Sequence, residues 1–446
     1  MNKKLIIPKQ IVSADESDTI YTGYGLEITD DKITSIRKFA DDEISSFSGE
    51  VAIKDNLTLI PGFVQTHIHL CQTLFRGLAD DLQLLDWLQK KIFPFENAHN
   101  KNSLRISVQL GLNELLKSGT TTVLDMGTLN HQEVIFEELI SSGLRAAAGK
   151  CMMDVNDLFP RFKGKTNAEL IEAYSLANEF HRKESYISYA FAPRFVLSCS
   201  DELLRETREM LKDFEGSLFH THSSENKDEL QIIRKKYKKD NIEYYHHLEL
   251  TNDHSVLAHC IHVNENEINI LKESGTRVAH CPSSNLKLGS GIADIPRFIN
   301  EGISVSLGAD GAPCNNNLSV FNEMRLAALL QKYRYSPGTM DAKTVFRMAT
   351  IEGAKALHMN ETGSIETGKK ADIVLLDLED AVQPLLGDGD NIYSSIVYSA
   401  GLQNINSVMV NGKWKIKDKE NLIFSEKELY CRGRVELNLL LDRVKE

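Results

Sequence analysis

The stretch Leu57-Thr-Leu-Ile-Pro-Gly-Phe-Val-Gln-Thr-His67-Ile-His69 joins an apolar run and a turn to two histidines that are one residue apart. On an extended strand, side chains two positions apart point to the same face, so the two imidazoles converge. Neutral imidazole nitrogens are common ligands of divalent metal ions. Two ligands alone do not make a site, so further ligands must come from elsewhere in the chain.

Metal-ligating and acid–base side chains recur downstream, each just after a short apolar run. In a barrel of parallel strands, several strand ends each supply one side chain to a common mouth. For a single histidine a local structural hydrogen bond is the better explanation, but five positions at strand ends favour one shared site. These positions are His222, Glu225, His259, His280 and Asp310.

Apolar strands alternate with amphipathic helical segments between residues 59 and 365, which is typical of an α/β fold with parallel strands. Seven such runs follow the strand that ends at His69. Eight β units of this kind predict a (β/α)8 barrel of the TIM type. The seven runs are 121–124, 146–150, 187–191, 218–220, 256–259, 277–280 and 305–308.

Short strand-like runs fill residues 1–58, and β character returns at 371–377 and 408–414, where Asn411-Gly412 predicts a two-residue turn. Because these segments flank the predicted barrel, we expect them to form a small β-sandwich domain built from both termini. The predicted domains are therefore 1–58 plus 366–446, and the barrel at 59–365.

The charge balance argues against a nucleic-acid partner. The 446-residue chain has 51 basic and 63 acidic residues, a net charge of −12. Nucleic-acid binding instead requires clustered lysines and arginines that face phosphates. The one basic run, Arg234-Lys-Lys-Tyr-Lys-Lys239, is typical of a solvated helix end.

Cysteine usage and the first residues predict a cytoplasmic protein. The seven cysteines are an odd number without a Cys-x-x-Cys pair, which is typical of free thiols in a reducing compartment. Pro8 and Lys9 come before any long apolar region, which argues against a signal peptide. No stretch approaches the roughly 20 apolar residues that span a bilayer. The oligomeric state stays open, a homo-oligomer included.

The motifs resemble those of the amidohydrolase superfamily over nearly the whole chain. The similar branch holds the deaminases of 5'-deoxyadenosine, methylthioadenosine and S-adenosylhomocysteine, the guanine deaminases and the s-triazine hydrolases. The motifs are Pro-Gly-Phe-Val-Gln-Thr-His67-Ile-His69, Thr73-Leu-Phe-Arg-Gly-Leu-Ala-Asp-Asp-Leu82, His222-Ser-Ser-Glu225, Ala258-His259-Cys, His280-Cys-Pro-Ser-Ser-Asn285 and Gly308-Ala-Asp310.

The resemblance implies one divalent metal ion, zinc with iron as the alternative, held by the counterparts of His67, His69, His222 and Asp310. Three imidazoles and one carboxylate leave a position open for water. Binuclear relatives add a carboxylated lysine at the end of strand four, where this chain has Arg194, so we expect a mononuclear site. His220 shares a strand face with His222 and is an alternative ligand on spacing alone; the resemblance favours His222.

The resemblance also implies roles in catalysis. A bound metal can lower the pKa of water from 15.7 to about 7. Asp310 would take the water proton, Glu225 would protonate a ring nitrogen of the substrate, and His259 would hydrogen-bond the water and the tetrahedral centre. His280 would join them, or only support the loop that follows it.

Substrate recognition is implied by five further positions. Glu96 resembles the carboxylate that holds ribose hydroxyls in adenosine-type deaminases, and Trp87 could wall an aromatic ring. Counterparts of Gln72 and Arg194 address the base edge in guanine deaminases. Lys150 and Arg194 stand where adenosine-type enzymes usually carry arginine and histidine.

The favoured function is therefore a deaminase of an adenosine-type nucleoside, a small heterocyclic substrate, with release of ammonia. Guanine deamination is the second choice, and hydrolysis of an s-triazine amino or chloro substituent the third. A non-enzymatic homologue that keeps the barrel is the alternative from another class. All four expected ligand positions are intact in this chain, which argues against a non-enzymatic homologue.

Overall fold

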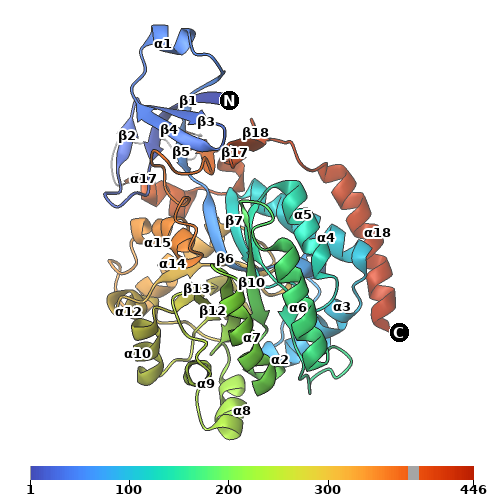
Figure 1. Ribbon diagram of the computed structural model, residues 1–446. Coiled ribbons are helices and arrows are strands. Elements are labelled where there is room, and N and C mark those ends of the chain that lie inside the picture. Colours follow the sequence, from blue (N-terminus) through green and yellow to red (C-terminus); the bar gives the residue numbers. More distant parts are fainter. Residues whose placement is uncertain (1, 380–390, 446) are drawn as a thin grey trace.

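The computed structural model describes residues 2–379 and 391–445 and has two parts, a barrel and a sheet made from both ends of the chain (Figure 1). Neighbouring barrel strands are parallel, and β9 (Cys151–Met152) adds to the edge of β10. The main strands are β6 (Phe63–His69), β7 (Thr120–Asp125), β8 (Arg145–Ala148), β10 (Ile187–Pro193), β11 (Leu218–Ser223), β12 (Ser255–His259), β13 (Arg277–His280), β14 (Val305–Leu307) and β15 (Asp310–Gly311).

The barrel closes through an interrupted eighth strand. β14 pairs with β13, and after two residues the chain continues as β15, which pairs with β6. The predicted (β/α)8 barrel is thereby confirmed, with every predicted run on a barrel strand. The interruption brings Asp310 level with Ile68, beside the two histidines of β6.

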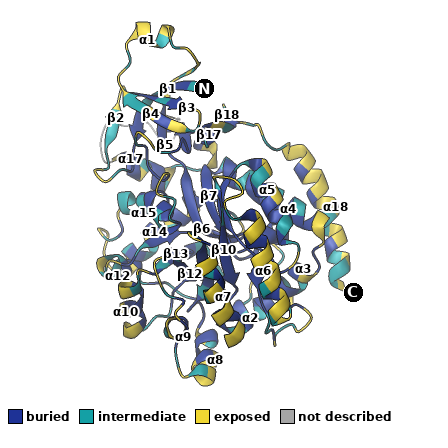
Figure 2. Cartoon of the chain, in the orientation of Figure 1, coloured by how far each residue is buried: buried dark blue, intermediate teal, exposed yellow. Residues whose placement is uncertain are grey.

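Helices surround the barrel and turn their polar faces outward, while the strands inside are buried (Figure 2). Such burial on both faces is what makes parallel strands apolar throughout. The outer helices are α4 (Lys101–Lys117), α5 (Gln132–Ser142), α6 (Thr166–Phe180), α7 (Asp201–Asp213), α8 (Lys227–Tyr237), α9 (Asn241–His247), α10 (Glu265–Ser274), α12 (Ile295–Asn300), α14 (Val320–Arg334), α15 (Ala342–Met348) and α16 (Ile351–Ala356).

Short helical segments follow the barrel strands at the carboxyl ends, where sequence alone predicts little regular structure. The first four lie between β6 and α4, and three of them follow one another without a break from Leu84 to Asn97. They are η1 (Leu70–Phe75), α2 (Leu84–Trp87), η2 (Leu88–Ile92), α3 (Phe93–Asn97), η3 (Val196–Ser198), α11 (Pro282–Lys287) and α13 (Ala312–Asn315).

Both ends of the chain build one mixed sheet, where the sequence predicts a small β-sandwich made from both termini. Within the described residues it has nine strands, and β5 lies at its centre, parallel to β1 and antiparallel to β16. The short helix α1 (Asp41–Ser45) lies at its far end (Figure 1). The strands are β1 (Lys3–Val12), β2 (Ile20–Thr22), β3 (Gly25–Thr29), β4 (Lys32–Arg37), β5 (Glu50–Pro61), β16 (Ile373–Leu376), β17 (Ile405–Val410), β18 (Lys413–Lys417) and β19 (Glu420–Asn421).

The turn between β17 and β18 has the predicted two residues, Asn411 and Gly412, with φ values of 49° and 68°. Two positive φ values suit the hairpin turn whose twist matches the strands. A Cβ atom added to Gly412 would lie 2.0 Å from the carbonyl oxygen of Asp30 and would collide with it. Glycine is therefore required here by both conformation and space.

The last helix, α18 (Glu426–Lys445), lies along the barrel and not in the terminal sheet (Figure 1). It packs on α4 and α3, and Arg443 Nε donates to the carbonyl oxygen of Ala98 at 2.7 Å. The segment 366–446 thus contributes to both parts of the molecule. Among the described residues, no helix is long and apolar enough to cross a membrane.

A buried ion pair joins the barrel to the terminal sheet. Arg145 Nε, at the start of β8, donates to Asp372 Oδ2 at 2.7 Å, and both side chains are 2% exposed. Asp372→Ala would leave the guanidinium buried without its main partner. We expect a loss of about 3 kcal/mol in the free energy of unfolding, measured with urea. Removing the half-exposed Glu137, which pairs with Arg105, is the control and should cost less than about 1 kcal/mol.

Candidate active site

Four potential metal ligands meet at the barrel mouth. His67 and His69 come from β6, His222 from β11 and Asp310 from β15, and one ligand atom of each lies within 4.8 Å of every other. His69 Nε2 lies 3.2 Å from His222 Nε2 and 3.3 Å from Asp310 Oδ1, and His67 Nε2 is also 3.3 Å from that oxygen. The strand ends therefore gather the predicted set at one point.

Hydrogen bonds behind the cluster fix which imidazole nitrogens face it. His220 Nδ1 lies 2.9 Å from the carbonyl oxygen of Val256, which can only accept, so His220 Nε2 is left as an acceptor. His67 Nδ1 then donates to it at 2.8 Å. His222 Nδ1 likewise donates to the carbonyl oxygen of Arg194 at 2.6 Å. The Nε2 lone pairs of His67 and His222 are thereby turned toward the cluster.

The cluster as it stands fits a cation. His67 Nε2 is buried without a hydrogen-bond partner, and two nitrogen lone pairs and a carboxylate face one another across about one ion's width. Bare acceptors in such contact repel, and leaving buried acceptors unpaired is costly. A divalent ion coordinated by three imidazoles and one carboxylate removes both problems.

His220 lies behind His67 and is not among the four gathered ligands. Spacing alone cannot separate it from His222, because both side chains leave the same face of β11. The register of the barrel separates them, since His222 is one step closer to the mouth. His220 is instead placed to orient His67.

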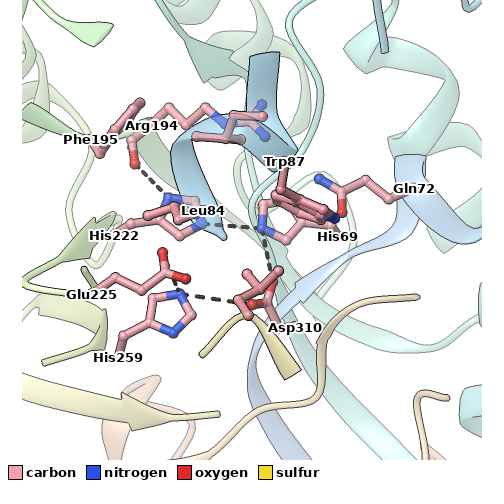
Figure 3. Close-up of a pocket in the computed structure, with 12 residues that line it drawn as sticks. His69, Gln72, Leu84, Trp87, Arg194, Phe195, His222, Glu225, His259 and Asp310 are labelled. Atoms are coloured by element: carbon pink, nitrogen blue, oxygen red, sulfur yellow. Dashed lines mark hydrogen bonds and ion pairs between the residues drawn. The ribbon is translucent and has the colours of Figure 1, made fainter. Parts of the chain in front are cut away.

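Glu225 and His259 lie beside the cluster (Figure 3). His259 Nε2 is 3.5 Å from Glu225 Oε2 and 3.8 Å from Asp310 Oδ2, and its Nδ1 lies 2.8 Å from Asn285 Oδ1. Burial raises the pKa of Glu225 to about 7, although His259 acts in the opposite direction. For His259 the effect of burial is the opposite and lowers the pKa, but the negative charges of Glu225 and Asp310 outweigh it. The net result is a raised pKa of His259.

The backbone is unusual at two of these side chains. His259 has φ of 74° and Asp310 has φ of 62°, a region that residues other than glycine rarely adopt. Strained conformations of this kind persist where surrounding contacts hold them and often mark functional sites. Asp310 is held by Ser284 Oγ, which donates to its Oδ2 at 2.7 Å, and by the amide of Gly311.

His280 ends β13 and is 1% exposed, but it does not line the cavity. Both of its ring nitrogens lack hydrogen-bond partners. Burial lowers its pKa to about 3, with a smaller contribution from His259, so the ring is neutral. The structure thus brings His280 near the mouth without a direct contact to the four ligands.

The cluster opens into a cavity at the barrel mouth. Figure 3 shows Trp87 at the upper right, with Glu225 and His259 at the lower left. Apolar walls with a few polar groups are typical of sites for small heterocycles. The lining residues are His69, Gln72, Leu84, Trp87, Leu88, Arg194, Phe195, His222, Glu225, His259, Leu288 and Asp310.

Glu96 does not reach the cavity wall. Its carboxylate is 2% exposed and accepts from Arg194 NH1 at 2.6 Å, from Arg194 NH2 at 3.1 Å and from Gln72 Nε2 at 2.7 Å. The guanidinium also lies 5.1 Å from the centre of the Phe93 ring. Glu96 therefore holds Arg194 and Gln72 in place, and these two, not Glu96, face the cavity.

Lys150 is also outside the cavity lining. Its ammonium group is buried and contacts the carboxylates of Glu169 at 3.4 Å and Glu172 at 3.1 Å, and it donates to the carbonyl oxygen of Leu129. Its neighbours in the sequence gave no sign of these partners, which belong to α6. In this structure Lys150 supports the loop after β8.

Sequence reasoning did not single out several residues of the site. Leu84, Phe195 and Leu288 wall the cavity, and apolar residues in irregular segments carry no periodic signal. Leu88, which together with Trp87 is expected from the sequence to wall an aromatic ring, also lines the cavity. Asn285 lay in a quoted motif without a role, and it bonds His259. Phe195 directly follows Arg194 after β10, a position that strand counting could have identified.

Fold and site together define a barrel with a candidate metal centre at its strand ends. The amidohydrolase family model matches residues 58–415. A 5-methylthioadenosine/S-adenosylhomocysteine deaminase of Bacillus cytotoxicus is 34% identical over 444 residues, 97% of this chain and 99% of the relative. A 5'-deoxyadenosine deaminase of Methanocaldococcus jannaschii is 35% identical over 440 residues, 98% and 99% of the two chains.

The similarity extends to solved structures. The crystal structure of an adenosine deaminase from Xanthomonas campestris with bound zinc matches with a TM-score of 0.90 at 29% identity, covering 100% of this chain and 99% of that one. The chain belongs to the amidohydrolase family, a family of metal-dependent enzymes. The resemblance and the enzyme class predicted from the motifs are confirmed.

Proposed function

We propose that this chain is a hydrolytic deaminase that replaces the exocyclic amine of an adenosine-type nucleoside and releases ammonia. The substrates of the two relatives named above support the substrate class. The observation that carries the reaction type is the position of Glu225, buried and beside both the ligand cluster and the cavity. Such a carboxyl group suits proton transfer to a bound heterocycle.

One zinc ion, with iron as the alternative, would be held by His67, His69, His222 and Asp310. When bound, the metal supplies a water molecule acidified enough to act at neutral pH. A mononuclear site is supported by the residue that follows β10, which is Arg194, paired with Glu96, and not a lysine.

The residues around the cluster divide the proton transfers. Asp310, with Oδ2 bonded by Ser284, is the base that takes the water proton. Glu225 delivers a proton to the ring nitrogen next to the attacked carbon, and its pKa of about 7 lets it both give and take a proton near neutrality. His259 donates to the developing oxyanion, oriented by Asn285.

The apolar side chains of the cavity exclude water around the purine ring of the substrate. They are Trp87, Leu84, Leu88, Phe195 and Leu288. Arg194 and Gln72 supply polar contacts to the substrate from the cavity lining. Glu96 acts through them, which replaces the direct contact with ribose expected from the sequence. The same arrangement favours guanine deamination as the second candidate, because a guanidinium and an amide suit the polar edge of a free base.

A double variant tests the role of Arg194. Arg194→Met with Glu96→Gln removes both charges and keeps the volume, so neither group is left buried and unpaired. We expect kcat/KM for the nucleoside to fall roughly tenfold to a hundredfold, the value of a hydrogen bond to a charged group. Bound metal should stay unchanged, and unaltered kcat/KM would remove Arg194 from substrate binding.

A substrate panel tests the proposed class. Ammonia release is measured with 5'-deoxyadenosine, methylthioadenosine, S-adenosylhomocysteine, guanine and an amino-s-triazine. We expect the best kcat/KM for one of the three nucleosides, at least tenfold above guanine. Guanine turnover above that of every nucleoside would establish the second candidate instead.

The remaining assignments follow from charge and composition. A cytoplasmic enzyme that acts on a small molecule without a nucleic-acid partner is consistent with the net charge of −12 and with buried, unpaired thiols at six of the seven cysteines. A homo-oligomer is compatible with this proposal. Sedimentation of the purified protein measures its size directly.

A further inference from the structure

Two loops at the barrel mouth support Asp310 and His259 through hydrogen bonds. In the segment after β13, Ser284 Oγ donates to Asp310 Oδ2 at 2.7 Å, and Asn285 Oδ1 lies 2.8 Å from His259 Nδ1. In the segment after β15, Asn315 Nδ2 donates at 2.7 Å to the carbonyl oxygen of Ala309, the residue before Asp310. The placement of both groups thus depends on these loops.

One buried side chain on the outer helix α14 joins the two loops. Glu323 is 0% exposed and does not line the cavity. From the first loop it accepts from the amide of Ser283 at 3.1 Å and from Ser283 Oγ at 2.5 Å. From the second it accepts from Asn315 Nδ2 at 2.8 Å. A single carboxylate therefore sets the spacing between the loops.

Burying a carboxylate costs more free energy than burying a neutral side chain in the same structural contact. Burial raises the pKa of Glu323 to about 7, and the residues that donate to its carboxylate, Ser283 and Asn315, are neutral. A buried charge without a cation is tolerated only where donors surround it. Three donors from two loops do so here, and no neutral side chain accepts from all three in this geometry.

We propose that Glu323 is a positioning residue that holds Asp310 and His259 in their working orientation through Ser284, Asn285 and Asn315. This inference rests on the roles given to Asp310 and His259 in the proposed function. It assigns a contribution to metal binding and turnover to a residue that contacts neither metal nor substrate.

A matched control exists within the barrel. Glu267 on α10 is also 0% exposed, burial raises its pKa to about 7, and it accepts from the amides of Asn264 and Ile242 at 3.0 and 2.9 Å. It caps and joins α9 and α10 and bonds no residue that touches Asp310. If burial of a carboxylate were all that mattered, Glu323→Gln and Glu267→Gln would behave alike.

The test compares the two variants in three measurements. Glutamine keeps the size of the side chain but turns a donor toward Ser283, so we expect Glu323→Gln to weaken zinc affinity, measured by chelator competition, by 10- to 100-fold. We expect kcat to fall by a similar factor while KM changes less than about twofold. Glu267→Gln should lower the melting temperature comparably and leave zinc affinity and kcat within about twofold of the wild type.

Equal zinc affinity and kcat in the two variants would overturn the inference. If Glu323→Gln does not fold, Ser284→Ala is the second variant, because it removes the hydrogen bond from the same loop to Asp310. Wild-type zinc affinity in Ser284→Ala would overturn the inference equally. A wild type that binds zinc but deaminates no substrate would reject the proposed function alone, because chelator competition still measures the effect of Glu323.

Discussion

Replacing Asp310 or His67 with alanine is expected to reduce ammonia release to that of a metal-free blank. Each side chain belongs to the cluster whose ligand atoms lie within 4.8 Å of one another, and each loss leaves three of the four ligands. Asp310 is also the proposed base, so metal and proton acceptor disappear together. Metal per chain, measured by atomic emission on the purified variants, should fall with activity.

A paired comparison on one strand sharpens this prediction. His222→Ala should lose the metal, since His222 presents Nε2 to the cluster. His220→Ala should keep one metal per chain, because His220 lies behind His67 and is not among the four gathered ligands. Removing such an outer contact should weaken affinity by about 10- to 100-fold. One metal per chain and full turnover in His67→Ala would show that the site is misplaced.

Glu225→Gln is expected to lower kcat by roughly 10²- to 10⁴-fold with the metal retained. Glutamine preserves shape and hydrogen bonding but cannot transfer a proton, and general acid–base catalysis is usually worth that factor. Glu225 lies 3.5 Å from His259 and is not among the four gathered ligands, so metal content should not change. Steady-state kinetics and metal analysis on one preparation measure both quantities.

Glu267→Gln serves again as the control for burial of a carboxylate. It should leave kcat near the wild-type value. If Glu225→Gln turned over substrate as fast as the wild type, the proton would have to travel through another group. His280, buried and near the mouth with two unpaired nitrogens, would be the next candidate to test.

Sequence reasoning predicted the barrel well because the relevant signals are local and repeated. Each strand is a short apolar run, and the site residues lie at or near the ends of these runs, as His67 and His69 do on β6. Parallel strands then bring those offsets to one edge. The segments that differ from expectation are those whose partners are distant in sequence.

Glu96 illustrates the limit. Its sequence neighbours suggest a carboxylate near the substrate, but its partner Arg194 is 98 residues away. Pairing with Arg194 removes Glu96 from the cavity wall and changes the role of both. Lys150 likewise pairs with Glu169 and Glu172 and does not line the cavity. Helix α18 packs on α4, but the composition of the sequence does not change near residue 426 in a way that predicts this packing.

Titration of metal-free protein with zinc, followed by ammonia release from 5'-deoxyadenosine or methylthioadenosine, tests the central claim most directly. The account predicts no release without metal, a linear rise with added zinc, and a plateau at one ion per chain. Full activity in the metal-free protein, a plateau at two ions, or no release at any loading would contradict it.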